Sequence, residues 1–275
     1  MKWLNYTLAL SALLLLMVTV TLPDNLLHVY FCDVGQGDGA LITQGLTQII
    51  IDAGPDNGKF VQCLANHIPF YDHTIELAIG THPQADHEGG YTSVLQRYTI
   101  LQFVTTKANN PAKFFQDLKK QLANVKYINT GDRINIGELS LLTIWPTADF
   151  VAAHDDAKTD LNQFALVQKL SYGDMDILFT AGADQPTEDG QLATRLLGRV
   201  EVLKVPHHGS KTGMHDEWLN KIHPQMAVIS VGAKNTYGHP TQEALDLLTK
   251  YKIKILRTDQ AGTIQVTSDG HKWWL

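Results

Sequence analysis

Short apolar runs separated by turns rich in Gly, Pro and Asp dominate the chain from residue 25 onwards. This pattern predicts many strands with helices between them. The expected strands are 28–33, 40–43, 48–51, 75–79, 100–105, 126–128, 133–136, 139–144, 162–170, 175–180, 201–205, 226–231, 253–257 and 263–267. The expected helices are 59–67, 91–97, 111–122, 187–197 and 241–251. Because the two halves have similar element order, we expect two sheets packed face to face with helices outside.

The first 24 residues follow a different pattern. The stretch Trp3 to Pro23 contains no charged residue, and a bilayer span needs ~20 apolar residues. Lys2 precedes it and Asp24 follows it, which favours an amino terminus inside and a domain outside. We therefore expect residues 1–24 to be a single-pass anchor in the cell membrane. A cleaved signal segment is the alternative, although no A-x-A site precedes residue 25.

Composition limits the remaining choices. The 275 residues carry a formal net charge of −6, with 22 Lys and Arg against 28 Asp and Glu, so no polybasic footprint for duplex DNA is present. No linker or tandem repeat interrupts residues 25–275, which we interpret as one domain. Two cysteines make no disulfide framework and no CxxC pair, so thiolate zinc is not expected. Cys32 lies in an apolar run that is typical of a buried small residue.

Candidate chemistry is concentrated in THPQADHEGG, residues 81–90. His82, Asp86 and His87 follow a buried strand and precede a helix, and such loops commonly present functional groups. Imidazole and carboxylate groups in this arrangement suit zinc or manganese. The alternative for this motif alone is a polar loop whose histidines bond the backbone.

Other loops at predicted strand ends carry similar side chains. They hold Asp33, Asp38, Asp184, His207, His208, Ser210, Tyr237 and His239. Each loop alone could be an ordinary surface loop. Together they offer His and Asp side chains from separate elements, which is how a catalytic metal site is assembled.

These motifs resemble a known family. The matching stretches are FCDVGQGDGALI (31–42), IIIDAGP (49–55), THPQADHEGG (81–90), FTAGAD (179–184), LKVPHHGS (203–210), ISVGAKNTYGHP (229–240) and RTDQAGTI (257–264). Their order and spacing are similar to those of the extracellular domain of ComEC competence proteins, which have the metallo-β-lactamase fold and act in DNA uptake. The resemblance implies an α+β, four-layer αββα sandwich with a metal site at one edge.

The resemblance also implies a ligand set. Asp86, His87 and a late histidine, His207 or His208, would hold one metal, and His82 would belong to a second position. Asp184 would supply the bridging carboxylate. Where the family has HxHxDH or HxDxDH, this chain has Gln84, and an amide oxygen is a poor ligand for a transition metal.

Further departures affect the same second position. The family's TGD motif is altered here, and the usual mid-chain histidine is not evident, although His154 lies in the right region. We therefore expect one tight site for zinc or manganese and a doubtful second one.

Roles for the remaining residues follow from the same resemblance. Asp86 would orient the attacking water, and His239 would contact phosphate, protonate the leaving group or simply form a turn. Tyr237 could stack on a base or be a core aromatic. The residues expected to support ligands or contact substrate are Asp33, Asp38, His208, Ser210 and Tyr237.

The resulting functional hypothesis is a membrane-anchored, metal-dependent nuclease or phosphodiesterase that acts on DNA during uptake. Its expected partners are DNA or another phosphodiester, the membrane and components of the competence channel. A hydrolase of a small ester, lactone or β-lactam is one alternative, and a non-catalytic, degenerate binding module is another. A full ComEC protein has many membrane spans, so the chain is expected to be either a stand-alone relative or a carboxy-terminal fragment.

Overall fold

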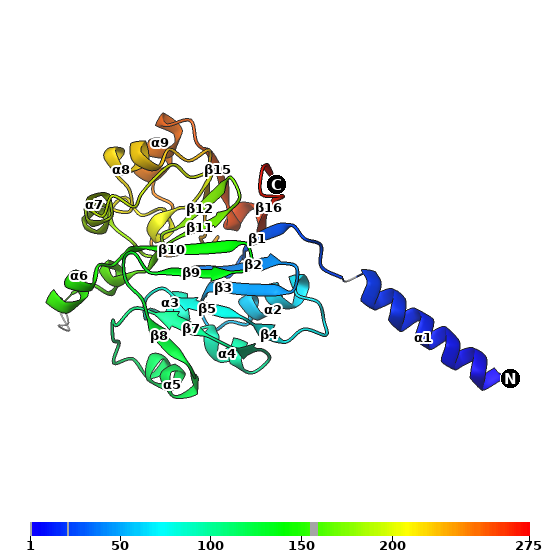
Figure 1. Ribbon diagram of the computed structural model, residues 1–275. Coiled ribbons are helices and arrows are strands. Elements are labelled where there is room, and N and C mark those ends of the chain that lie inside the picture. Colours follow the sequence, from blue (N-terminus) through cyan, green and yellow to red (C-terminus); the bar gives the residue numbers. More distant parts are fainter. Residues whose placement is uncertain (1, 21, 155–158) are drawn as a thin grey trace.

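Two β-sheets form the centre of the molecule in a computed structural model that describes residues 2–20, 22–154 and 159–275 (Figure 1). The first sheet has the strand order β17-β16-β1-β2-β3-β5-β7-β8. Its strands are β1 (Leu27–Phe31), β2 (Gly39–Gln44), β3 (Thr47–Ala53), β5 (Leu77–Gly80), β7 (Phe103–Thr105), β8 (Val125–Tyr127), β16 (Ile264–Ser268) and β17 (Trp273–Trp274). The strands from β3 to β8 are parallel, and the others pair antiparallel.

The second sheet has the strand order β15-β14-β13-β12-β11-β10-β9. Its strands are β9 (Arg133–Ile136), β10 (Leu139–Trp145), β11 (Val167–Tyr172), β12 (Met175–Phe179), β13 (Val202–Lys204), β14 (Met226–Ile229) and β15 (Lys254–Arg257). Here the strands from β12 to β15 are parallel. Each sheet therefore has a parallel part whose carboxyl ends point to one edge, and such edges are where α/β sheets place their functional loops.

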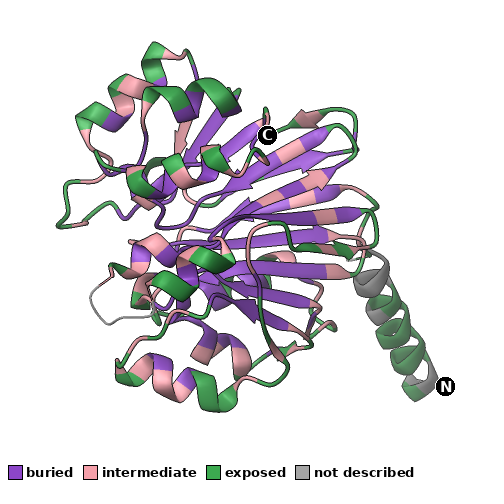
Figure 2. Cartoon of the chain, turned by 60° about the vertical axis from the view of Figure 1, so that its left-hand side comes forward, coloured by how far each residue is buried: buried purple, intermediate pink, exposed green. Residues whose placement is uncertain are grey.

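The core lies between the two sheets, as the alternating apolar pattern requires. Phe31 and Ile42 of the first sheet pack in one cluster with Ile177 and Val228 of the second. Outside the sheets, α2 (Lys59–His67), α4 (Tyr91–Leu95) and α5 (Lys113–Gln121) cover one face. On the other face lie α7 (Gln185–Ala193), α8 (Asp216–Ile222) and α9 (Gln242–Lys250). Figure 2 shows strands that are mostly buried and helices with exposed outer faces, so the predicted sandwich is confirmed.

Most predicted elements are present, but two strands are divided. The run 75–79 becomes β4 (Thr74–Ile75) and β5, and the run 100–105 becomes β6 (Thr99–Ile100) and β7. The short strands β4 and β6 pair with each other in a separate two-stranded sheet. Several short helices were not predicted from the sequence, namely α6 (Ala148–Ala153), α8, α10 (Thr258–Ala261) and the 3-10 turn η1 (Leu161–Phe164).

The amino-terminal helix α1 (Lys2–Val20) extends away from the sandwich in Figure 1. Its side chains Trp3, Tyr6 and Leu8 are largely exposed. Within the described ranges, no helix has both the length and the apolar character that a bilayer crossing requires. The membrane span expected for residues 3–23 is therefore not supported.

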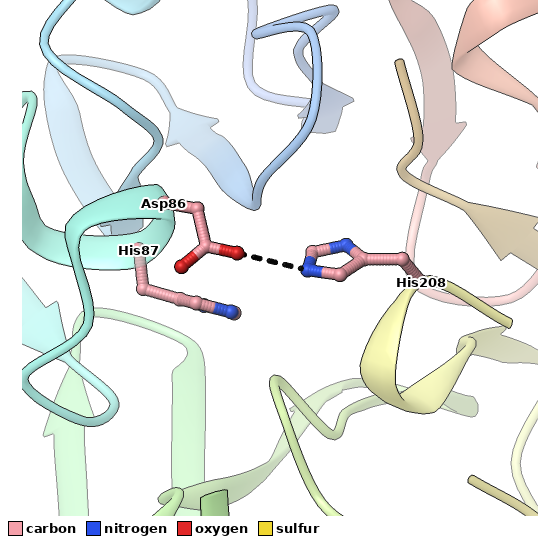
Figure 3. A group of neighbouring side chains, drawn as sticks. All are labelled: Asp86, His87 and His208. Carbon is pink, nitrogen blue, oxygen red and sulfur yellow. Dashed lines mark ion pairs between the residues drawn. The ribbon is translucent and has the colours of Figure 1, made fainter. Parts of the chain in front are cut away.

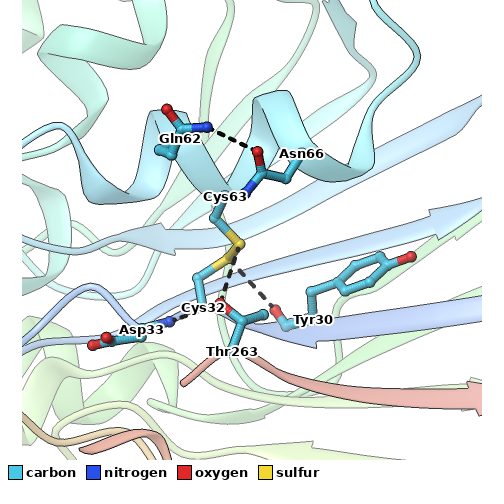
Figure 4. The surroundings of a disulfide bond; sticks show 7 residues. All are labelled: Tyr30, Cys32, Asp33, Gln62, Cys63, Asn66 and Thr263. Atoms are coloured by element: carbon cyan, nitrogen blue, oxygen red, sulfur yellow. Dashed lines mark hydrogen bonds between the residues drawn. A yellow bond between two sulfur atoms is a disulfide. The ribbon is translucent and has the colours of Figure 1, made fainter. Parts of the chain in front are cut away.

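Cys32 is buried as expected, but it is not a free thiol. Its sulfur forms a disulfide with Cys63 of α2, and the two Cα atoms lie 6.1 Å apart (Figure 4). The sequence did not predict this bond, because two cysteines 31 residues apart carry no recognisable disulfide spacing. The bond attaches the end of β1 to the helix that covers the first sheet.

Candidate metal centre

Two groups of side chains from distant parts of the chain meet at the edge formed by the parallel strands. Asp86 and His87 lie on α3 (Ala85–Glu88), which follows β5 in the first sheet. His208 lies in η2 (Pro206–Gly209), which follows β13 in the second sheet. One ligand atom from each of the three lies within 4.8 Å of the others, and Nε2 of His208 is 3.4 Å from Oδ2 of Asp86 (Figure 3).

His87 is oriented by a buried carboxylate at the end of β3. Its Nδ1 lies 2.7 Å from Oδ2 of Asp52, and both side chains are buried. Asp52 also accepts hydrogen bonds from Thr81, at 2.9 Å from the backbone nitrogen and 2.7 Å from Oγ1. Because a carboxylate accepts, Nδ1 of His87 carries the proton, and Nε2 keeps a lone pair for a metal.

The charges around His87 also affect its protonation. Burial alone would lower the pKa of His87, but the neighbouring carboxylates of Asp52 and Asp86 outweigh it and raise the pKa. Asp86 responds in the opposite direction. Burial would raise its pKa, yet His87 and His208 hold the pKa well below its ordinary value, so Asp86 is a carboxylate at neutral pH.

His208 is held in the same way as His87, by groups on its Nδ1. That nitrogen lies 2.9 Å from the carbonyl oxygen of Ser230 and 3.3 Å from Oδ1 of Asp38. Burial would lower the pKa of His208, but Asp38 and Asp86 raise it to about 9. The backbone of His208 has φ +55°, in the left-handed region that costs non-glycine residues energy.

Asp38 connects the two histidines to a buried lysine. Its carboxylate lies 3.7 Å from Nδ1 of His87 and forms an ion pair with Nζ of Lys204 in β13. Burial would raise the pKa of Asp38, but Lys204 and His208 hold it well below its ordinary value. Asp38, expected to support ligand histidines, contacts both His87 and His208, and that role stays a prediction. Lys204 was not predicted.

His82 lies beside this cluster and offers one more nitrogen. Its ring centroid is 4.1 Å from that of His87, and its Nδ1 lies 3.0 Å from Oγ1 of Thr81. Its Nε2 is buried and has no hydrogen-bond partner among the described residues. Burial and the nearby His87 keep the pKa of His82 well below its ordinary value, so the ring is neutral.

The unsatisfied Nε2 atom of His82 bears on whether the side chains at this edge fit a metal. Buried polar atoms are rarely without a partner, and an imidazole nitrogen next to a carboxylate and two oriented histidines is a suitable metal ligand. A Cβ atom added at Gly182 would come within 2.9 Å of His82 Nε2, so a side chain at position 182 would press against this nitrogen. His82 itself lies outside the group of Asp86, His87 and His208, whose ligand atoms lie within 4.8 Å of one another, and the imidazole and carboxylate donors of that group fit a divalent metal.

Three other predicted residues have different contacts. Asp184 begins α7 as its N-cap and accepts a hydrogen bond from the backbone nitrogen of Thr187 at 3.3 Å. Asp33 is partly exposed and forms an ion pair with Lys59 at 3.4 Å. Ser210 Oγ lies 3.1 Å from the hydroxyl of Thr212. None of the three belongs to the groups of described residues that could hold a metal, and their proposed roles stay predictions.

The predicted residues of the late loops form a row of rings next to the cluster. The ring of His207 is 6.3 Å from that of His208 and 5.8 Å from that of His239, and Tyr237 stacks on His239 at 5.9 Å. His208, rather than His207, is grouped with Asp86 and His87. His154 lies on Phe150 instead, with ring centroids 4.2 Å apart.

Asp52 and Lys204 are the site residues that sequence reasoning missed. Asp52 ends the apolar run IIID, and Lys204 is the single charge in the apolar strand VLKV. A charged residue inside or at the end of a buried strand usually has a partner, because burying an unpaired charge costs free energy. The positions of Asp52 and Lys204 could therefore have marked them as candidates. Neither could be assigned a partner without the fold, because their contacts are more than 25 residues away in sequence.

Comparison with known proteins gives the class first. No protein-family model matches the chain. The metallo-β-lactamase-fold protein YhfI of Bacillus subtilis superposes with a TM-score of 0.58 at 11% identity, covering 88% of this chain and 100% of that one. At that identity the likeness shows the fold alone. The chain is a metallo-β-lactamase-fold protein.

The curated relatives narrow the class. The chain is 30% identical over 195 residues to ComE operon protein 3 of Bacillus subtilis, covering 70% of the chain and 24% of the relative. It is 25% identical over 237 residues to Recombination protein 2 of Haemophilus influenzae, covering 85% and 28%. The chain spans about a quarter of the length of these relatives. It is therefore a ComEC-like protein of the metallo-β-lactamase fold.

Proposed function

We propose that the chain is a metal-dependent phosphodiesterase that hydrolyses DNA during its uptake. The observation that supports this most is the meeting of Asp86, His87 and His208 from the two sheets, with one ligand atom of each within 4.8 Å. Both histidines have their Nδ1 atoms engaged by acceptors, so each ring presents Nε2 to the centre, where it would bind a metal after losing its proton.

A divalent ion held by these three residues would lower the pKa of bound water and so supply hydroxide near neutral pH. The chain's own residues prepare this chemistry. Asp52 fixes the tautomer and direction of His87, and Asp38 with the Ser230 carbonyl does the same for His208. Asp86 is the most exposed of the three ligands, and its carboxylate can orient a water molecule on the solvent side.

The pKa of His239 bears on which of its predicted roles is favoured. Burial lowers the pKa of His239, and so does the nearby His208, so the ring is mostly neutral at neutral pH. A neutral imidazole is a poor proton donor to a leaving oxygen. We therefore assign His239 to contact with the substrate phosphate rather than to protonation of the leaving group.

A phosphodiester substrate is favoured over a small ester or β-lactam by two features. One relative is named Recombination protein 2, and another, from Neisseria gonorrhoeae, is named Competence protein ComA, and both processes concern DNA. The loops of His208 and Tyr237 also carry the exposed lysines Lys211 and Lys234, which suit a phosphate backbone. The membrane location and the channel partners stay predictions, and fractionation with protease treatment of intact spheroplasts tests the outward orientation.

The deciding experiment measures bound metal and activity together on the full chain. Elemental analysis by mass spectrometry identifies the ion, zinc or manganese, and the substrates are single-stranded DNA, bis-p-nitrophenyl phosphate and nitrocefin. We expect one tightly bound ion and hydrolysis of both phosphodiesters. His87→Ala should lose metal and activity, while the exposed control His271→Ala should keep both.

Other outcomes of this experiment point to the alternatives. Turnover of nitrocefin alone would identify a β-lactam hydrolase. The absence of both bound metal and turnover, in a protein that still unfolds cooperatively, would identify a non-catalytic binding module. Turnover of DNA that persists undiminished in His87→Ala would refute the proposed metal centre.

A further inference from the structure

A row of aromatic and imidazole rings leads from the candidate metal centre to the surface. The row begins at His208 and continues through His207 and His239 to Tyr237, with successive ring centroids 6.3, 5.8 and 5.9 Å apart. Exposure increases along it, from a buried His208 to a Tyr237 that is 70% exposed. Tyr237 is therefore the exposed end of a row of rings that begins at a candidate metal ligand.

Tyr237 has no structural task that would explain its position. One ring face stacks on His239 with an interplanar angle of 26°, and its hydroxyl has no hydrogen bond within the described part of the chain. A core aromatic, the alternative prediction for this residue, is excluded by its exposure. One face of the Tyr237 ring is therefore covered by His239, and the other face is open to a ligand.

The loop that carries this ring is held in place by one side chain. Asn235 donates from Nδ2 to the carbonyl oxygens of Gly232 at 2.9 Å and His239 at 2.7 Å. Its Oδ1 accepts from the backbone nitrogens of His239 at 3.0 Å and Tyr237 at 3.2 Å. Because the loop is ordered before binding, a ligand loses little free energy in ordering it.

Charge near the row indicates which kind of ligand it suits. Lys234 lies in the same loop as Tyr237, and Lys211 follows the loop that carries His207 and His208. Both side chains are exposed, in a chain whose formal net charge is −6. An open ring face with nearby lysines fits a ligand that has both planar rings and phosphates.

We infer that Tyr237, supported by His239, is a stacking platform for an unpaired base of a single-stranded nucleic acid whose backbone reaches the candidate metal centre. This inference rests on the proposed function and names its substrate class. Bases in a duplex already have both faces stacked, so only an unpaired strand can offer a free face. Stacking on an aromatic ring does not distinguish between bases, so the site should accept any sequence.

The experiment compares two oligonucleotides on the full chain. One is an oligothymidylate, and the other is an oligomer of equal length made of abasic residues, which keeps the phosphates and removes the rings. We expect Tyr237→Ala to raise KM for the oligothymidylate about tenfold with kcat within about twofold. The same variant should leave KM for the abasic oligomer unchanged, and Tyr237→Phe should behave as wild type.

Two controls make the result specific to this ring. Phe70→Ala removes a similarly exposed aromatic from the loop between α2 and β4, and it should leave both KM values unchanged. Thermal unfolding should be alike for all variants because both rings are exposed. Equal KM values for wild type and Tyr237→Ala on the oligothymidylate, or an equal rise on both oligomers, would overturn the platform.

A binding measurement separates this inference from the proposed function. If the wild type hydrolyses neither oligomer, the proposed phosphodiesterase activity fails. Fluorescence anisotropy of the two labelled oligomers then gives Kd directly. A Kd for the oligothymidylate that rises about tenfold in Tyr237→Ala still supports the platform, and an unchanged Kd overturns it.

Discussion

Replacing Asp52 by asparagine should weaken metal binding about 10- to 100-fold while the fold is retained. Asp52 is buried and accepts three hydrogen bonds on two oxygens, from Thr81 N at 2.9 Å, Thr81 Oγ1 at 2.7 Å and His87 Nδ1 at 2.7 Å. Asparagine has the same shape but only one oxygen. That single oxygen cannot accept from both Thr81 N and His87 Nδ1.

The magnitude follows from the two ways in which the amide can be placed. With its oxygen towards Thr81 N, its NH2 group faces His87 Nδ1, so the ring proton moves to Nε2 and blocks ligation. With its oxygen towards His87, its NH2 group faces the backbone N–H of Thr81, and two donors oppose each other at a cost of about 1–3 kcal/mol. The first arrangement lowers metal affinity, and the second lowers the free energy of unfolding.

The assay is a competition titration of metal against a chromophoric chelator, with urea unfolding of the same samples. Asp56→Asn is the matched control, since Asp56 is exposed and four residues further along the chain. We expect the control to match the wild type in both measurements. If Asp52→Asn binds metal within about twofold of the wild type and unfolds at the same urea concentration, the assignment of His87 as an oriented ligand is wrong.

Three further predictions concern the ligands and a buried acid. His208→Ala should lose about 10- to 100-fold in metal affinity and His207→Ala little, and the reverse order would make His207 the ligand. Gln84→Asp should raise the occupancy of a second ion beside His82, and an unchanged metal-to-protein ratio in mass spectrometry would contradict it. Burial raises the pKa of Glu188 to about 10 from an ordinary 4.5, so the folded state keeps a proton that the unfolded state loses. The free energy of unfolding should therefore fall between about pH 4.5 and pH 10, by up to about 1.4 kcal/mol per pH unit, and urea titrations of Glu188→Gln at several pH values should lack this fall.

The fold could be predicted to a large extent because its information is local. Apolar runs of strand length and the Gly-containing turns between them place the hairpin of β2 and β3 and the helix α2 within a few residues. The division of 75–79 into β4 and β5 was missed. Its cause is a change of pairing partner from β6 to β3 and β7, which no property of those five residues reveals.

The site could be predicted only in part because its contacts are long-range. His82, Asp86 and His87 share one short motif, and the sequence identified them as candidates. Choosing between His207 and His208 required the backbone, since both have positive φ values but only His208 faces Asp86.

Asp184 shows another limit of prediction from sequence. The family resemblance implies a bridging ligand at this position, which stays a prediction, and in the structure its carboxylate accepts a hydrogen bond at the start of α7. The altered motif around Asp184 does not indicate whether the carboxylate binds a metal or caps the helix.

Because of the Cys32–Cys63 disulfide, the stability of this site depends on the redox state of the compartment that holds the protein. The loop that it closes contains β2 and β3 and both aspartates, Asp38 and Asp52, that orient the ligand histidines. A closed loop of 31 residues raises the free energy of the unfolded chain by roughly 4 kcal/mol in the chain-entropy model. Reducing cytosol removes that contribution. Protein made there would be less stable in the segment that holds Asp38 and Asp52, so production in an oxidising compartment is the condition under which its metal binding should be measured.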